Sequence, residues 1–360
     1  APGALGAPAG GVLRVGGLRY VAPYLQEIRL RLRSYEGRRL GDVLAEAASS
    51  QFRVSPAWWA SELSQGRVAV ERCGRSEVRL EPVGADYVIG KDERVRARKH
   101  MHERVTPDVN PVVVHEDSDF LAVSKPAGVD IFANPNGGAL KSSLVGLLAD
   151  MGHPKLLPGH RIDKGVSGVV CMAKNYKALS RLMRCIKRRA ARKTYLTRVR
   201  CVDGRLPEEG MLLDAPLTTR HDIKTSKDIA VVDLEGGKEA RTVVQRVLPK
   251  CSDGTAVLVV GIHTGRMHQI RCHLQHAGFP IANDGQYGGV AEPSRPLYQD
   301  NAAGDLRAIL GRHHNEHCQH CAFLRQVLDG DVPPPLLEPC IWLHSWRYDF
   351  PSLGLALEAP

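Results

Sequence analysis

The 360-residue sequence has few aromatic residues and no long apolar run. Phe, Trp and Tyr make up only 5% of it, which argues against a protein that stacks long single strands of nucleic acid on aromatic platforms. No apolar run approaches the roughly 20 residues needed to span a bilayer, so we expect no membrane partner. Repeats of the solenoid type are also absent. The length indicates two domains, with ample chain for a large core.

Acidic residues are outnumbered, with 39 Asp and Glu against 49 Lys and Arg and a net charge of +10. Such an excess favours a polyanionic partner, because binding releases counterions. The nine cysteines are an odd number scattered through a long chain. Most lie in apolar runs, as buried free thiols do. This pattern is typical of a reducing intracellular compartment rather than of a disulfide framework.

The chain divides into a lead and two further parts. Residues 1–16 are rich in Gly, Ala and Pro and are predicted to be a flexible lead. Residues 17–106 show helical spacing at 40–47, a second apolar face at 58–63 and a strand after Gly66. They predict a small α+β module with a connector. It is either an RNA-binding-like module or a lobe that stabilises the rest.

The third part, residues 107–360, alternates short strands with helices. Helices are expected at 144–148 and 176–189, and a further one over 266–277, ended by Gly278. Mixed strands and helices predict an α+β fold with a large, mixed, mostly antiparallel sheet. Residues 291–339 are predicted to be an irregular insertion in this domain.

Three separated segments carry residues suited to chemistry. The first runs from His160 to Gly168 and places Asp163 just before the apolar run 169–173, which predicts a buried strand. Its carboxylate therefore lies on a loop that enters the core. The second is the strand 192–199, which contains Tyr195. The third, 265–274, contains Arg266, His268 and Arg271.

In order and spacing these segments resemble the RluA-type RNA pseudouridine synthases, in their eukaryotic branch. The first is similar to the motif His-Arg-Leu-Asp-x-x-Thr-Ser-Gly, the second to Lys-x-Tyr-x-Ala-x-Val and the third to Gly-Arg-Thr-His-Gln-Ile-Arg-Val-His. Lys125-Pro126-Ala127-Gly128 matches Lys-Pro-x-Gly. The likeness covers about residues 17–350. Val166 and Met267 stand where the family has Thr.

The resemblance implies roles for individual residues. Asp163 falls on the nucleophilic aspartate, and Arg271 is the cation whose bidentate fork keeps it ionised. Tyr195 packs against the target base once that base has left its stack. Further residues are expected to contact RNA or to shape the site. Arg161 fills the space that the base vacates, His160 orients the loop, Arg266 and His268 belong to the substrate-binding set, and Lys125 either reaches a phosphate or is a solvated turn lysine.

No acidic residue occurs between Asp163 and Asp203. The densest basic cluster in this stretch, the basic strip, consists of Lys187, Arg188, Arg189, Arg192 and Lys193. We expect it to follow the RNA backbone rather than to read bases. The alternative is an ordinary solvated face.

Metal donors gather at 313–321, where Cys318 and Cys321 form a Cys-x-x-Cys pair among several histidines. These donors suffice for tetrahedral zinc, but a second well-spaced pair is absent, so a mobile His-rich loop is the favoured interpretation. We expect no catalytic metal and no cofactor, because the isomerisation includes no redox step.

The sequence thus predicts an enzyme that isomerises specific uridines of rRNA or tRNA, with RNA as its partner and ribosomal assembly particles as further candidates. A monomer is expected. The alternative is a catalytically silent RNA-binding or ribosome-assembly factor on the same fold. Asp163, Tyr195 and Arg271 favour the enzyme, whereas Val166 and Met267 leave the alternative open. The Arg-rich residues 1–35 fit an organelle presequence and a basic RNA-binding edge equally, so a mitochondrial and a cytoplasmic or nuclear location both stay open.

Overall fold

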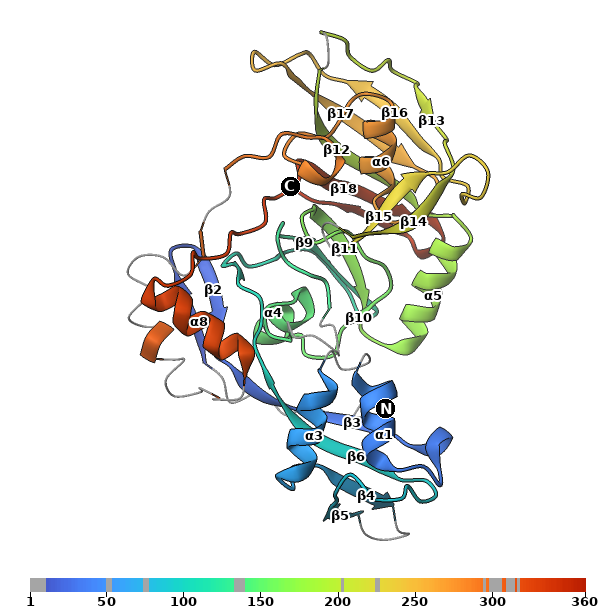
Figure 1. The fold of residues 1–360 in the computed structure, drawn as a ribbon. Coiled ribbons are helices and arrows are strands. Elements are labelled where there is room, and N and C mark those ends of the chain that lie inside the picture. The colour runs from blue at the N-terminus through green and yellow to red at the C-terminus, as the bar shows by residue number, and fades with distance from the viewer. Residues whose placement is uncertain are drawn as a thin grey trace. The chain divides into compact units, whose positions relative to one another are not determined.

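The computed structural model forms two compact units, which are described separately (Figure 1). Unit 1 comprises residues 1–105, 133–141 and 298–334, and unit 2 comprises 106–132, 142–297 and 335–360. The structure describes residues 11–49, 54–73, 78–132, 140–201, 204–223, 227–293, 296–297, 306–308, 315 and 318–360. Among these residues, no helix is both long and apolar enough to cross a membrane.

Unit 1 is built on a four-stranded antiparallel sheet in the order β3-β6-β4-β5. Its strands are β3 (Tyr24–Arg31), β4 (Ala69–Cys73), β5 (Val78–Pro82) and β6 (Arg94–Met101). Its helical segments are η1 (Arg33–Tyr35), α1 (Leu40–Val43), the π-helical η2 (Leu44–Ala48) and α3 (Pro56–Ser64). Trp59 of α3 is 1% exposed and lies in the apolar core beneath the sheet. The α+β pattern expected over 37–99 is therefore present.

Two expectations for unit 1 are wrong. Residues 12–15, expected to be part of a flexible lead, form the strand β1 (Val12–Val15). This strand pairs with β2 (Leu18–Val21) in an antiparallel register along its whole length. The insertion 291–339 is not irregular throughout. It contains α8 (Gln319–Asp329), which buries Cys321, Leu324 and Val327 at helical spacing. Residues 298–334, assigned to the catalytic domain from sequence, cluster with unit 1 instead.

Unit 2 contains a ten-stranded sheet, in which β13-β16-β17-β12-β18-β11-β9-β8 follow one another and β10 and β19 pair with β11 and β18. Its strands are β8 (Val112–Glu116), β9 (Phe120–Lys125), β10 (Leu157–Pro158), β11 (Ser167–Ala173), β12 (Arg192–Arg200), β13 (Leu212–Leu213), β16 (Thr242–Val247), β17 (Thr255–Ile262), β18 (Leu343–Phe350) and β19 (Leu355–Glu358). β11 and β18 run parallel, whereas the other recorded pairs run antiparallel. The expected α+β class and mostly antiparallel sheet are confirmed.

The parallel contact of β11 with β18 requires a glycine. Gly168 has a φ of 110°, and a Cβ at this position would lie 2.1 Å from the carbonyl oxygen of Ser345 on β18. Only glycine allows two backbones to approach so closely. Gly168, at the start of β11 just after the Asp163 loop, is therefore a packing requirement.

Helices and a hairpin cover parts of the unit 2 sheet (Figure 1). They are α4 (Leu144–Asp150), α5 (Tyr176–Lys187), which packs on β10 and β11, and α6 (Gln269–His276), which packs on β16 and on the hairpin β14 (Leu217–Asp222) and β15 (Lys227–Val232). The remaining short elements are β7 (Thr106–Pro107), η3 (Gly285–Tyr287) and η4 (Pro351–Leu353). The helix expected from residue 266 begins only at Gln269, because His268 adopts a left-handed conformation with a φ of 49°.

Candidate active site

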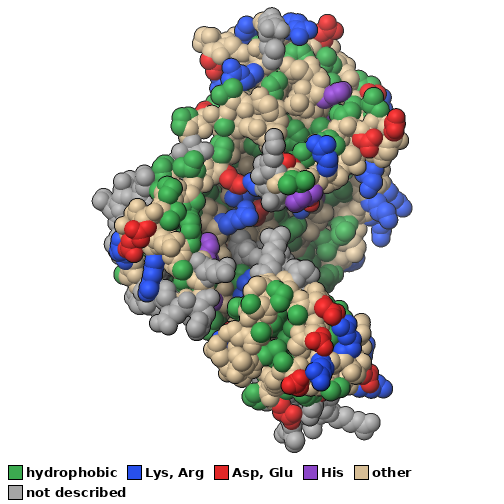
Figure 2. Space-filling model, viewed as in Figure 1, with side chains coloured by type: hydrophobic (Ala, Val, Ile, Leu, Met, Phe, Trp, Pro, Cys, Tyr) green, Lys and Arg blue, Asp and Glu red, His purple; other side chains and the backbone are tan. Residues whose placement is uncertain are grey.

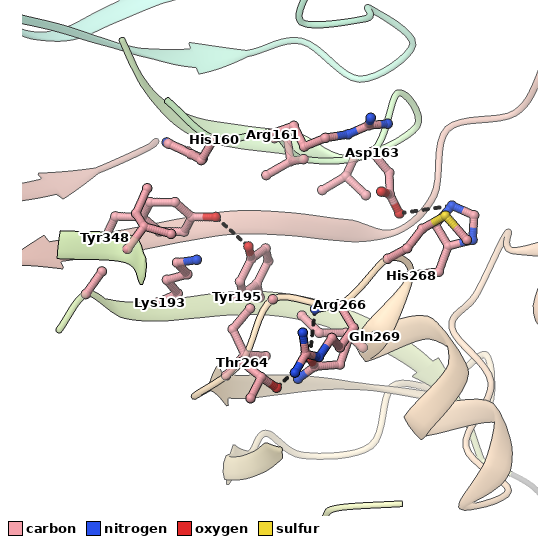
Figure 3. A pocket seen from close by; sticks show the side chains of 18 of the residues that line it. His160, Arg161, Asp163, Lys193, Tyr195, Thr264, Arg266, His268, Gln269 and Tyr348 are labelled. Atoms are coloured by element: carbon pink, nitrogen blue, oxygen red, sulfur yellow. Dashed lines mark hydrogen bonds and ion pairs between the residues drawn. The ribbon is translucent and has the colours of Figure 1, made fainter. Parts of the chain in front are cut away.

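A pocket of about 640 Å³ lies in unit 2 between the Asp163 loop, β12 and the segment that enters α6. Figure 3 shows Asp163, His268 and Tyr195 lining it from three different elements. The expected residues Arg161, Lys187, Arg189, Lys193, Arg266 and Arg271 also line it, as does His160. The structure thus brings together the three segments that the sequence keeps far apart.

Asp163 faces a buried arginine. Its Oδ2 lies 3.3 Å from Nη1 of Arg271, slightly beyond the roughly 3.2 Å of an ordinary hydrogen bond and within ion-pair range. Arg271 is 5% exposed, whereas the Asp163 side chain is 24% exposed and open to the pocket. The carboxylate is therefore accessible while its cation is not.

The bidentate fork expected for Arg271 is directed elsewhere. Its Nε and Nη2 donate to the two carboxylate oxygens of Asp284, at 2.7 and 2.9 Å, and Nη2 also donates to Gln286. The guanidinium lies 4.7 Å above the ring of Tyr287. The carboxylate of Asp284 and the aromatic face of Tyr287 hold the guanidinium in place. Only Nη1 is left for Asp163.

His268 contacts the same carboxylate from the other side. Its Nε2 lies 3.7 Å from Asp163 Oδ2, and its Nδ1 shares a 2.9 Å hydrogen bond with the hydroxyl of Tyr287. Burial lowers the pKa of His268, although the charge of Asp163 acts in the opposite direction. Its positive φ is costly for a non-glycine residue and is held by these contacts.

Tyr195 forms the inner wall beside Tyr348. Both side chains are buried, and their hydroxyls lie 2.5 Å apart. Burial raises the pKa of Tyr195 well above its usual value, so the phenol stays protonated at neutral pH. Tyr195 is neither sealed away from Asp163 nor exposed to bulk solvent, since it lines the pocket.

Lys193 differs from the rest of the basic strip. Its ammonium lies 5.7 Å from the ring centre of Tyr348, inside the pocket, and burial lowers its pKa. Lys187, Arg188 and Arg192 are exposed, as expected. Arg189 is exposed too, but Glu239 accepts two hydrogen bonds from it, at 3.0 and 2.9 Å. Figure 2 shows Lys and Arg side chains gathered on the edge of unit 2 that carries α5.

His160 anchors the Asp163 loop to the sheet. Its Nε2 accepts a 3.0 Å hydrogen bond from the backbone N–H of Cys171 on β11, and its ring packs against Tyr348. Burial, with a smaller contribution from Lys193, lowers the pKa of His160 to about 3. The imidazole is therefore neutral at physiological pH. This geometry suits a residue that orients the loop.

Lys125 does neither of the things expected of it. It is fully buried, and its Nζ donates to the carbonyl oxygens of Pro126, Val129 and Lys164 at 2.8, 2.8 and 3.2 Å. It is neither a phosphate contact nor a solvated turn residue, because three backbone acceptors occupy its ammonium. Lys125 ties the Lys-Pro-x-Gly turn to the Asp163 loop.

The segment that precedes α6 is held by Gln269. Its Oε1 accepts from the Thr264 hydroxyl at 2.7 Å and from the Arg266 backbone N–H at 3.0 Å (Figure 3). The Arg266 side chain donates through Nε to the Glu239 carbonyl oxygen at 2.9 Å. Arg161, in contrast, is exposed at the pocket rim. Arg161 is thus the more available of the two arginines for a ligand.

Sequence reasoning missed Asp284 and Tyr348. Asp284 lies within the residues 17–350 over which the resemblance extends, so its pairing with a buried cation had a signal in the sequence. Tyr348 had none, since it looks like one more buried strand residue. Val166 and Met267 both line the pocket, and neither displaces the Asp163–Arg271 contact.

Comparisons with known proteins find similarity to RNA pseudouridine synthases. A family described as RNA pseudouridylate synthase matches residues 119–276. RNA pseudouridine synthase 7 of Oryza sativa is 32% identical over 96% of this chain and 90% of its own length. The tRNA pseudouridine(31) synthase of Saccharomyces cerevisiae is 28% identical over 92% of each chain. The ribosomal large subunit pseudouridine synthase D of Pseudomonas aeruginosa is 30% identical over 70% of this chain and 74% of its own length.

Proposed function

Because this chain belongs to the RluA-type family of RNA pseudouridine synthases, it is an intramolecular isomerase, and we propose that Asp163 is the nucleophile with which it converts specific uridines of tRNA or rRNA. The observation that carries the proposal is the accessible carboxylate of Asp163 opposite the fixed Nη1 of Arg271. No other part of the pocket combines an open carboxylate with a buried cation among the described residues.

The reaction exchanges one bond of the sugar for another. The N1–C1′ bond breaks, the uracil turns, C5 bonds to C1′, and C5 loses a proton while N1 gains one. Electrons and atoms balance without an oxidant or a reductant. A carboxylate beside the sugar is the group that such glycosidic cleavage needs, and Asp163 supplies it.

Arg271 places a buried positive charge 3.3 Å from this carboxylate. Because Asp284 and Gln286 already hold Arg271, its position does not depend on Asp163. The cation is thus preorganised rather than recruited when the substrate enters.

The target uridine has to leave its stack to reach Asp163. The 640 Å³ pocket falls within the range of ligand sites, and Tyr195 and Tyr348 offer an apolar wall for the uracil. We assign Tyr195 to contact with the flipped base and to the proton at C5. Arg161, exposed at the rim, is assigned to the space that the base leaves.

The class of RNA is inferred from relatives. The names of the yeast and Pseudomonas relatives specify tRNA and the ribosomal large subunit, respectively. We therefore propose a structured RNA of one of these classes. Its backbone would be followed by the exposed side chains of Lys187, Arg188 and Arg192.

The test compares pseudouridine maps of total RNA from cells that carry the wild-type protein, no protein or Asp163→Asn. Sites should appear with wild-type protein only, whereas the purified Asn variant should bind RNA as tightly as wild-type protein. Asp228→Asn, an equally conservative change at a side chain 62% exposed on β15, serves as the control. Turnover by the Asp163→Asn variant at the wild-type rate would refute the assignment.

A further inference from the structure

Four metal-binding side chains meet in unit 1, outside the pocket just described. They are His100, His102, Cys318 and Cys321, and their donor atoms all lie within 4.8 Å of one another. More than 200 residues of sequence separate the histidines from the cysteines. The second ligand pair that residues 313–321 lack comes from the strand β6 and the residue that follows it. The expectation that no second pair exists is therefore wrong.

Local structure explains how each pair is presented. His100 and His102 are two positions apart at the end of β6, so their side chains point to the same face. Cys318 is the N-cap residue of α8 and Cys321 lies three positions later, which puts both thiols on one side of the first turn. An extended His-x-His and a helical Cys-x-x-Cys thus converge on one point.

The distances fit a single tetrahedral ion. Cys318 Sγ lies 3.5 Å from His102 Nε2, and Cys321 Sγ lies 3.3 Å from His102 Nε2 and 3.8 Å from His100 Nδ1. Bonds of about 2.3 Å to sulfur and about 2.0–2.1 Å to nitrogen, at tetrahedral angles, place S and N roughly 3.6 Å apart. The three distances scatter around that value.

We propose that these four residues bind a structural Zn²⁺. Two thiolates and two imidazoles form a donor set that zinc prefers. All four positions are filled by the protein, so no position is left for water or a substrate, and the ion has no catalytic role. His320 packs its ring against His102, at 4.4 Å between centroids, and contributes to the wall of the site.

The ion joins α8 to the strand that leads out of the N-terminal sheet. α8 also takes part in an apolar contact, in which Leu324 and Leu306 line a small cavity with Tyr20 and Val21. Cys321 is 1% exposed, so the site is closed to solvent on the helix side. Zinc binding to residues from distant segments contributes directly to their folding. It would fix α8 onto the end of β6.

The first experiment measures zinc in the purified full-length chain by elemental analysis. We expect about one zinc per chain in the wild-type protein, because four donors make one site, and a loss of at least tenfold in the Cys318→Ser/Cys321→Ser variant. The Cys201→Ser/Cys251→Ser variant, which changes two free cysteines of unit 2, should keep its zinc. Equal zinc in both double variants would overturn the proposal, as would a wild-type protein purified without zinc from zinc-supplied cells.

A second measurement remains informative if the cysteine variant fails to fold. Wild-type protein is stripped with a chelator and loaded with Co²⁺, which reports coordination through its visible spectrum. The intense bands of a tetrahedral ion with a thiolate-to-metal charge-transfer band are expected, and both should weaken in His100→Ala and in His102→Ala. An octahedral spectrum, or spectra that the histidine changes leave untouched, would contradict the proposal. So would a Cys318–Cys321 disulfide in protein isolated under reducing conditions.

Discussion

Asp284 holds the guanidinium of Arg271 through hydrogen bonds of 2.7 and 2.9 Å, and this leaves a single nitrogen, Nη1, to face Asp163. One arginine therefore serves two carboxylates with different roles. Asp284 is 2% exposed and fixes the cation, whereas Asp163 is open to the pocket. The charge opposite Asp163 is thus held in place without any contribution from a ligand.

Arg271→Lys should abolish most activity although it conserves the charge. A lysine ammonium is a point donor and cannot serve Asp284 and Asp163 at once with the geometry of a planar fork. We expect a loss of at least about 100-fold in single-turnover rate, of the size seen when one preorganised donor is removed. Arg347→Lys, at an exposed ion pair with Asp349, is the matched control. A wild-type rate in the Arg271→Lys variant would disprove the role of the fork.

Comparing the variants Tyr195→Phe and Tyr348→Phe distinguishes a role of the Tyr195 hydroxyl in the reaction from a role in stability alone. Each change removes one partner of the same 2.5 Å hydroxyl contact, so a merely structural contact predicts equal losses of stability, about 1 kcal/mol each. If the Tyr195 phenol handles the C5 proton, its loss should lower the single-turnover rate by about 10²–10⁴-fold, with a much smaller effect from Tyr348→Phe. Equal rates in the two variants would remove Tyr195 from the chemistry.

The basic strip should contribute to RNA affinity in a way that depends on the salt concentration. Removing the charges of Arg188, Arg189 and Arg192 should weaken binding to many RNAs alike and flatten the dependence of log affinity on log salt, by about 0.7–0.9 per lost phosphate contact. Arg189 is expected to contribute least, since Glu239 already pairs with it. Binding titrations across salt concentrations test this, with Arg205, Arg246 and Lys250, which are also exposed, changed in the control. If the slope of log affinity against log salt does not change in the variant, the basic strip is an ordinary solvated face that does not contact RNA.

His160→Gln should alter how stability depends on pH. The folded-state pKa of His160 is about 3, below the roughly 6.5 of an unfolded histidine, so the folded protein binds fewer protons between these values. The unfolding free energy therefore falls as the pH drops from about 6.5 toward 3, by up to about 1.4 kcal/mol per pH unit from this group.

A glutamine oxygen can still accept the Cys171 N–H, but it does not titrate. Between pH 6.5 and 5 the variant should therefore gain about 2 kcal/mol relative to wild-type protein. Urea unfolding at several pH values measures this difference. If the difference between the two proteins does not change with pH, His160 is not a buried neutral histidine.

The resemblance to the RluA-type family predicted one site for Asp163, Tyr195 and Arg271, because each lies in a contiguous motif that matches the family. The same reasoning failed for Lys125, since a turn lysine before Pro looks solvated from its neighbours alone. Only the folded chain shows the three carbonyl oxygens around its ammonium. One of the three acceptors, Lys164, is distant in the sequence, and no local pattern encodes that contact.

The four donors in unit 1 show the same limit at longer range. The pair at 318–321 is visible in the sequence, and so is His100-Met101-His102, but nothing local connects them. The helix that carries the cysteines had a signal in the spacing of Cys321, Leu324 and Val327. Predicting α8 from this spacing would have shown that both thiols of the Cys-x-x-Cys pair lie on the same side of one helix.

The position of β18 constrains the order in which this protein can fold during synthesis. Residues 343–350 lie between β12 and β11 in the sheet, although about 140 residues of chain separate β18 from β12. Until β18 emerges from the ribosome, β9 and β11 cannot join β12 and β17, and each half of the sheet exposes an unpaired strand edge. Exposed strand edges can pair with the wrong strand or with another chain. The risk is higher here, because a sheet with contacts between distant segments forms slowly. The pocket around Asp163, which Leu343 and Tyr348 help to line, is thus completed by one of the latest events of folding.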